Sequence, residues 1–135
     1  MLLPMSAFAI DREERTIYMD DGSYLTISLL IIQTRASGTK TATKTYQYTD
    51  SDGNIAWKAV LKGTFTYTGT NATCTSSACN VSIFDSSWYT ISKWAGKSGG
   101  AATAELTMGL KLLGVTVKKV PLSMTLICDA NGNLS

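Results

Sequence analysis

The sequence has no histidine, so it lacks the side chain that most often acts as a general base or metal ligand near neutral pH. Catalytic arrangements of the Ser-His-Asp and Cys-His kinds are therefore excluded. Only three cysteines are present, and three thiolates without histidine do not complete an ordinary four-ligand zinc site. We therefore expect no metal, no cofactor and no catalytic site, and any acid–base chemistry would fall to carboxylates or lysine.

An excess of charge of one sign is also lacking. The 135 residues include 12 basic and 10 acidic side chains, which give a net charge of +2. Lys118 and Lys119 are the only adjacent lysines, so the sequence shows no basic footprint for nucleic acid or for an anionic membrane. No apolar run reaches the roughly 20 residues that span a bilayer. We expect a mature chain that binds no nucleic acid and does not insert into a membrane.

The first nine residues are largely apolar and end in Ala7-Phe8-Ala9, just before the charged run at 11–15. An apolar segment followed by Ala-x-Ala is typical of a secretory signal and its cleavage site. We interpret residues 1–9 as the remnant of a signal peptide, cleaved after Ala9, and expect a secreted, extracellular protein. The alternative is that this segment is a first β-strand or a short buried N-terminal segment.

From Arg15 onward, apolar and polar residues alternate between turn signals, which is the pattern of half-buried β-strands. The clearest case is 55–67, whose predicted inward side includes Ile55, Trp57, Leu61 and Phe65. Some seven to nine such strands predict one all-β domain over 10–135. We expect a single antiparallel β-sandwich, immunoglobulin-like or similar, with a small β-barrel as the alternative.

Two polar segments, at 50–54 and 129–133, superficially resemble calcium loops. Both are too short and lack the distal glutamate of an EF-hand, so we predict Asx and glycine turns instead. Leu113-Gly114 is predicted as a hairpin turn. Pro121 cannot donate to a strand ladder, which places it at a sheet edge, a bulge or a break in pairing.

The cysteines are informative about the cellular compartment of the protein, because an exported protein enters an environment that favours disulfide formation. Cys74 alternates with polar threonines, and Cys128 shares a strand face with the apolar residues Val120, Leu122, Met124 and Leu126. Both cysteines are therefore predicted to face one interior. We predict a Cys74–Cys128 disulfide with Cys79 as a buried free thiol. The alternative is a Cys74–Cys79 pair across a tight bend.

Three aromatic residues, Trp88, Tyr89 and Trp94, gather in one short segment beside a glycine-rich run. If they project outward, they offer a surface for stacking on sugar rings or for contact with a protein. If they project inward, they belong to the core, and alternation alone does not decide between the two. Glu105 is the one acidic residue inside a predicted strand after residue 15, and its position opposite Leu106 predicts that it is solvated.

Three segments of the chain resemble a group of small secreted β-rich proteins of Gram-positive bacteria that have no known activity. The segments are "TIYMDDGSYLTISL", "TYQYTDSDGNIAWKAVLKGTFTYTGTNATCTSS" and "TLICDANGNLS", and the similarity extends from Arg15 to Ser135. The resemblance covers the strand from Trp57 to Lys62 and one cysteine each at Cys74 and Cys128. It implies export and supports the predicted disulfide, and it implies no catalytic activity.

These observations predict an exported, non-catalytic β-sandwich that acts as an extracellular binding or structural module. Its expected partner is a glycan or a protein at a cell surface. The alternative is a small secreted hydrolase that uses carboxylates from converging loops, because paired carboxylates suffice for glycoside hydrolysis.

Overall fold

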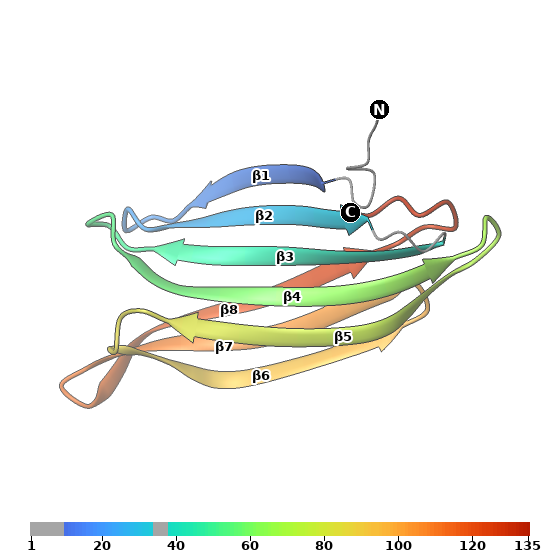
Figure 1. Ribbon diagram of the computed structural model, residues 1–135. Coiled ribbons are helices and arrows are strands. Elements are labelled where there is room, and N and C mark those ends of the chain that lie inside the picture. Colours follow the sequence, from blue (N-terminus) through green and yellow to red (C-terminus); the bar gives the residue numbers. More distant parts are fainter. Residues whose placement is uncertain (1–9, 34–37) are drawn as a thin grey trace.

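The computed structural model describes residues 10–33 and 38–135, so the predicted signal segment 1–9 lies outside the described residues. Eight strands are present: β1 (Ile10–Tyr18), β2 (Tyr24–Gln33), β3 (Thr39–Thr49), β4 (Ile55–Tyr67), β5 (Ala72–Ile83), β6 (Trp88–Ser98), β7 (Ala101–Leu112) and β8 (Val115–Ile127). They form two antiparallel sheets, ordered β1-β2-β3-β4-β5 and β6-β7-β8. Figure 1 shows the two sheets as separate layers. The predicted sandwich is confirmed, and the alternative of a closed barrel is wrong.

The chain passes from the larger sheet to the smaller one between β5 and β6. Two backbone N–H groups of this connection, at Phe84 and Asp85, donate to the carbonyl of Ala56 on β4, at 2.8 and 3.1 Å. Further along the same seam, the Lys93 ammonium of β6 donates to the carbonyl of Cys79 on β5 at 3.1 Å. The smaller sheet is thus joined to the larger one along β5, and β8 is its outer edge, where Pro121 lies as predicted.

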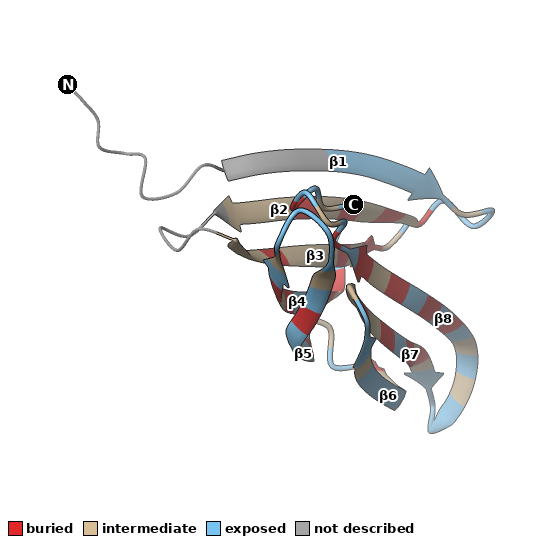
Figure 2. Cartoon of the chain, turned by 90° about the vertical axis from the view of Figure 1, so that its right-hand side faces the viewer, coloured by how far each residue is buried: buried red, intermediate tan, exposed pale blue. Residues whose placement is uncertain are grey.

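The core lies between the sheets and is built on β4, which is paired on both sides. Trp57, Leu61 and Phe65 of this strand are fully buried, as the alternation predicts. The ring of Trp57 stacks on Tyr48 of β3 at 5.3 Å between centroids, and Trp88 of β6 packs against Tyr48 at 4.8 Å. Figure 2 shows the resulting alternation of buried and exposed residues along β7 and β8.

Single extra residues in four strands, β4, β5, β6 and β8, interrupt this alternation. In β4, Tyr48 pairs with Trp57 and Thr49 pairs with Ile55, which leaves Ala56 as an extra residue. The bulge turns Ile55 outward, where it is 41% exposed, so its predicted place on the inward face is wrong. Ala56 is buried in its stead.

The turns at 50–54 and 129–133 are built alike. In each, the first aspartate accepts backbone N–H bonds through Oδ1 from the residues two and four positions on, at 2.9 to 3.0 Å. These are Asx turns, as predicted. Over the described residues, no group of three or more histidine, cysteine, aspartate or glutamate residues is arranged to hold a metal ion.

All three cysteines are buried and unpaired, so the predicted Cys74–Cys128 disulfide is not formed in this structure. Both residues nevertheless face one interior, and they flank the same turn. The Cys74 N–H donates to the Gly99 carbonyl at 2.6 Å, and the Cys128 N–H donates to the Gly100 carbonyl at 2.8 Å. Cys79 reaches this interior although it lies an odd number of residues from Cys74, because Thr75 is an extra residue between them.

Candidate functional site

The outer face of β6-β7-β8 carries a large exposed aromatic side chain, Trp94, which is 59% exposed. Trp94 of β6 pairs with Glu105 of β7, and Glu105 in turn pairs with Ser123 of β8. Side chains at directly paired positions project from the same face of a sheet. The indole, the carboxylate and the serine hydroxyl therefore lie in one row across the smaller sheet.

Trp88 and Trp94 lie on opposite faces of β6 although both have even numbers. Thr90 pairs with Met108 and Ser92 pairs with Thr107, which leaves Ile91 as an extra residue and reverses the alternation beyond it. Trp88 is consequently in the core at 4% exposure, and Trp94 is on the surface. Sequence alternation could not separate these two residues because the bulge lies between them.

The Trp94 indole lies along its own strand, over the backbone of Gly96. A Cβ atom at position 96 would be 2.6 Å from two carbons of the six-membered ring, which is too close for van der Waals contact. Glycine thus leaves room for the indole beside the backbone of residue 96. This arrangement leaves a broad apolar surface toward solvent.

A shallow hollow of about 370 Å³ lies beside Trp94 on the same sheet. It is lined by Ser92, Glu105, Leu106, Thr107, Pro121, Leu122 and Ser123. The exposed side chains in this set supply three hydroxyl groups and one carboxylate. The hollow therefore combines hydrogen-bond donors and acceptors with an adjacent apolar surface, the combination found in small-molecule binding sites.

Glu105 has no hydrogen-bond or ion-pair partner in the part of the chain that the structure describes. The nearby lysines of β6 are directed elsewhere, since Lys93 donates to the Cys79 carbonyl and Lys97 donates to the Thr75 carbonyl. The carboxylate is the only charged group among the residues that line the hollow. Its oxygens are free to accept hydrogen bonds from a ligand.

Tyr89, the third aromatic residue singled out in the sequence, is half-buried and already engaged. Its hydroxyl is hydrogen-bonded to that of Thr116 at 2.6 Å, and the Lys111 ammonium lies 4.6 Å from the centroid of its ring. Its ring also lies against Gly109. Tyr89 therefore connects β6 to residues of β7 and β8. Of the three aromatic residues, Trp94 alone has a ring that is largely exposed to solvent.

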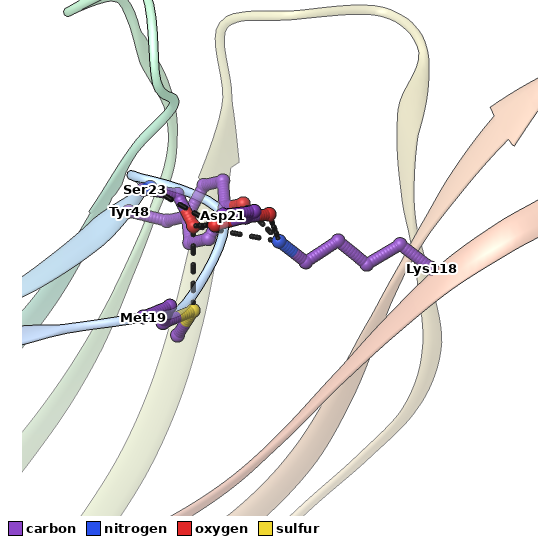
Figure 3. Close-up of polar contacts among 5 residues, drawn as sticks. All are labelled: Met19, Asp21, Ser23, Tyr48 and Lys118. Carbon is purple, nitrogen blue, oxygen red and sulfur yellow. Dashed lines mark hydrogen bonds and ion pairs between the residues drawn. The ribbon is translucent and has the colours of Figure 1, made fainter.

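A second polar cluster lies where the β1–β2 turn meets β8 (Figure 3). The Lys118 ammonium forms an ion pair with Asp21 and donates to the Tyr48 hydroxyl at 2.9 Å. The hydrogen bond from Lys118, with others from Ser23, lowers the pKa of the Asp21 carboxyl. Burial alone would lower the pKa of Lys118, but its bonds to Asp21 and Tyr48 prevail and raise it.

Because both groups are held in their charged forms, the cluster acts as a tether between the sheets rather than as a proton-transfer site. Local patterns in the sequence do not predict this cluster, since Asp21 and Lys118 are 97 residues apart. The only signal is that Lys118 stands close to the hairpin turn predicted at Leu113-Gly114.

A larger groove, of about 660 Å³, runs along the inner side of β1 and β2. Ile27 and Leu29 line it together with charged residues of both signs, Glu14, Arg15 and Lys44. Lys44 donates to the Thr125 carbonyl of the opposite sheet at 3.0 Å. The mixed charges favour no particular class of ligand.

No family model, curated protein or solved structure matches this chain. The resemblance to small secreted proteins of Gram-positive bacteria therefore stays a prediction. No helix in the described ranges is long and apolar enough to span a bilayer.

Proposed function

We propose that this protein is an exported, non-catalytic binding module that recognises a glycan on the outer face of β6-β7-β8. The observation that carries the proposal is the exposed Trp94 ring over Gly96, beside a hollow lined by hydroxyls and one free carboxylate. Export is supported by the Ala7-Phe8-Ala9 pattern at the end of an apolar segment.

Sugars suit this surface because they have both apolar and polar faces. The C–H face of a pyranose ring can pack on the open face of Trp94, as apolar groups pack on aromatic rings. The hydroxyls at the edge of the sugar can then donate to Glu105 and exchange hydrogen bonds with Ser92, Thr107 and Ser123. A carboxylate acceptor makes a stronger hydrogen bond than a neutral one, so Glu105 would fix the orientation of the sugar.

Hydrolysis, the alternative function, requires two carboxyl groups on either side of the scissile bond. Glu105 is the one acidic residue among those that line the hollow. The site thus favours binding over cleavage.

The test is to titrate the protein with a panel of neutral and charged oligosaccharides and to measure binding by calorimetry. We expect Trp94→Ala to weaken binding of the best ligand about tenfold or more, since a large aromatic contact is lost. Gly96→Val should also weaken it, because the added side chain displaces the indole. Phe84→Ala is the matched control, since Phe84 is also 59% exposed but lies on the β5–β6 connection.

Unchanged affinity in Trp94→Ala would contradict the proposed site. If Phe84→Ala lowers the affinity to the same extent, the proposed site is also contradicted. The effect of Trp94→Ala would then come from loss of exposed apolar surface in general, or from loss of folding. If mass spectrometry of the sugar detects a cleavage product, the protein is a hydrolase and the proposal of a non-catalytic binding module is wrong.

A further inference from the structure

The tip of the β7–β8 hairpin exposes a group of apolar side chains far from the Trp94 site. Leu113 is fully exposed, and its neighbours Leu112, Val115 and Val117 are each more than half exposed. Val117 is an extra residue in the pairing of β7 with β8, since Leu110 pairs with Lys118 and Lys111 with Thr116. Figures 1 and 2 show this hairpin projecting beyond the other turns of the molecule.

The apex has an unfavourable backbone conformation for its sequence. Leu113 has φ of +53° and Gly114 has φ of +78°, the pair of positive values expected for a two-residue type I′ turn. Asparagine or glycine suits the first position, whereas leucine is disfavoured in the left-handed region. Folding therefore gains nothing from a leucine here, either in backbone energy or in burial. Strained residues of this kind tend to occur at functional sites.

Two cations stand at the base of the hairpin on its outer side. Lys119 pairs with Gly109, and Lys111 lies two residues further along β7 on the same face. Neither lysine forms an ion pair within the described residues, whereas Lys118 is already paired with Asp21. The fold thus brings together charges that look dispersed in the sequence.

We propose that this hairpin tip docks on a membrane surface that contains anionic phospholipids. Leu112, Leu113 and Val115 would enter the interfacial layer, and Lys111 and Lys119 would contact lipid phosphates. The contact is peripheral, because a two-residue turn with its flanking residues is far shorter than a bilayer-spanning strand of about 9 residues or more.

A second copy of this chain is a poorer match for the tip. The tip is convex and needs a concave apolar receptor. The groove above Ile27 and Leu29 is the candidate on the described surface, but the cations Arg15 and Lys44 are among the residues that line it. These cations would repel the lysines of the incoming hairpin, whereas anionic lipid headgroups would attract them.

The decisive variant is Leu113→Asn, because asparagine suits the turn better than leucine while it removes the apolar apex. We expect its melting temperature to equal or exceed that of the parent, and its binding to vesicles of phosphatidylglycerol and phosphatidylcholine to fall about tenfold or more. Phe84→Asn is the control at an exposed apolar residue outside the hairpin and should keep vesicle binding. Lys111→Glu with Lys119→Glu should abolish the preference for anionic over purely phosphatidylcholine vesicles.

Vesicle flotation and light scattering give the readout. Full binding by a stable Leu113→Asn variant would overturn the proposal. Equal binding of the parent to anionic and zwitterionic vesicles would overturn the role of the lysines. If the parent does not bind vesicles but self-associates, and Leu113→Asn removes the self-association, the proposal is overturned. The partner of the hairpin tip would then be a second copy of the chain.

Discussion

The indole of Trp57 shows how one residue serves the core of this sandwich. Its ring is fully buried and stacks almost parallel on Tyr48, with 4° between the two planes. Its Nε1–H is buried without a hydrogen-bond partner among the described residues. The ring therefore contributes through packing alone, and its polar group opposes that contribution.

We predict that Trp57→Ala lowers the free energy of unfolding by about 3–5 kcal/mol, as for other large-to-small core changes. Trp57→Phe should cost considerably less, because it keeps an aromatic ring and removes the unpaired N–H. Urea denaturation followed by circular dichroism measures both. Equal midpoints for Trp57→Ala and the parent would contradict the assigned position of Trp57 in the core.

The ion pair of Asp21 and Lys118 predicts how stability changes in acid. The pKa of Asp21 is lowered in the folded protein, so the folded state favours the ionised carboxylate. Its contribution is present above the ordinary carboxyl pKa of about 3.9 and is lost as the pH falls from there toward the lowered value. Asp21 is half-exposed, so water screens the pair and keeps the contribution small.

Asp21→Asn should therefore lower the melting temperature near neutral pH and flatten its decline below about pH 4. Asp52→Asn is a suitable control, because Asp52 forms no ion pair within the described residues. A parallel decline in Asp21→Asn and the parent would show that the pair does not couple stability to pH.

At the scale of the strand, alternation in the sequence predicts which segments pair and which face of most strands is inward. It predicts the interior positions of Val120, Leu122, Met124 and Leu126, and the exposure of Glu105, all of which the structure confirms. Alternation is a local property, so it is reliable wherever the ladder is regular.

Bulges are where this reasoning fails, because an extra residue is selected by packing between strands and leaves no local mark. Ala56 reverses the face of Ile55, and Ile91 separates Trp88 from Trp94. In β5, a strand of 12 residues, the extra residue Thr75 likewise changes the face on which the later residues lie. The exposed aromatic site at Trp94 could thus be suspected from the sequence but not placed.

At the scale of the whole molecule, lysine side chains connect the two sheets at several points. Lys44, Lys93 and Lys97 each donate to a backbone carbonyl of the opposing sheet. Such bonds use polar groups at the sheet margins that would otherwise depend on water. Local alternation does not predict these bonds, since each partner lies at least 14 residues away along the chain.

Cys74 of β5 and Cys128, just after β8, are not at disulfide distance in this structure, so a covalent connection between them would require the local backbone to move. Burial raises the pKa of both thiols, and the proximity of Cys74 further raises that of Cys128. Because the thiolate is the reactive form, the folded, reduced protein should oxidise slowly. A bridge would therefore form during folding in an oxidising compartment, where a disulfide-bearing oxidant accepts the two electrons and two protons.

We predict that protein recovered after export carries a Cys74–Cys128 disulfide with Cys79 free, whereas protein folded in a reducing cytosol carries three free thiols. The bridge closes a loop of more than fifty residues, which in the chain-entropy model stabilises the fold by about 4 kcal/mol. Peptide mapping under non-reducing conditions identifies the pair, and reduction should lower the melting temperature of the exported form alone. Cys79→Ser is the control and should leave both results unchanged. Recovery of a Cys74–Cys79 linkage, or of three alkylated cysteines after export, would show that the bridge does not form.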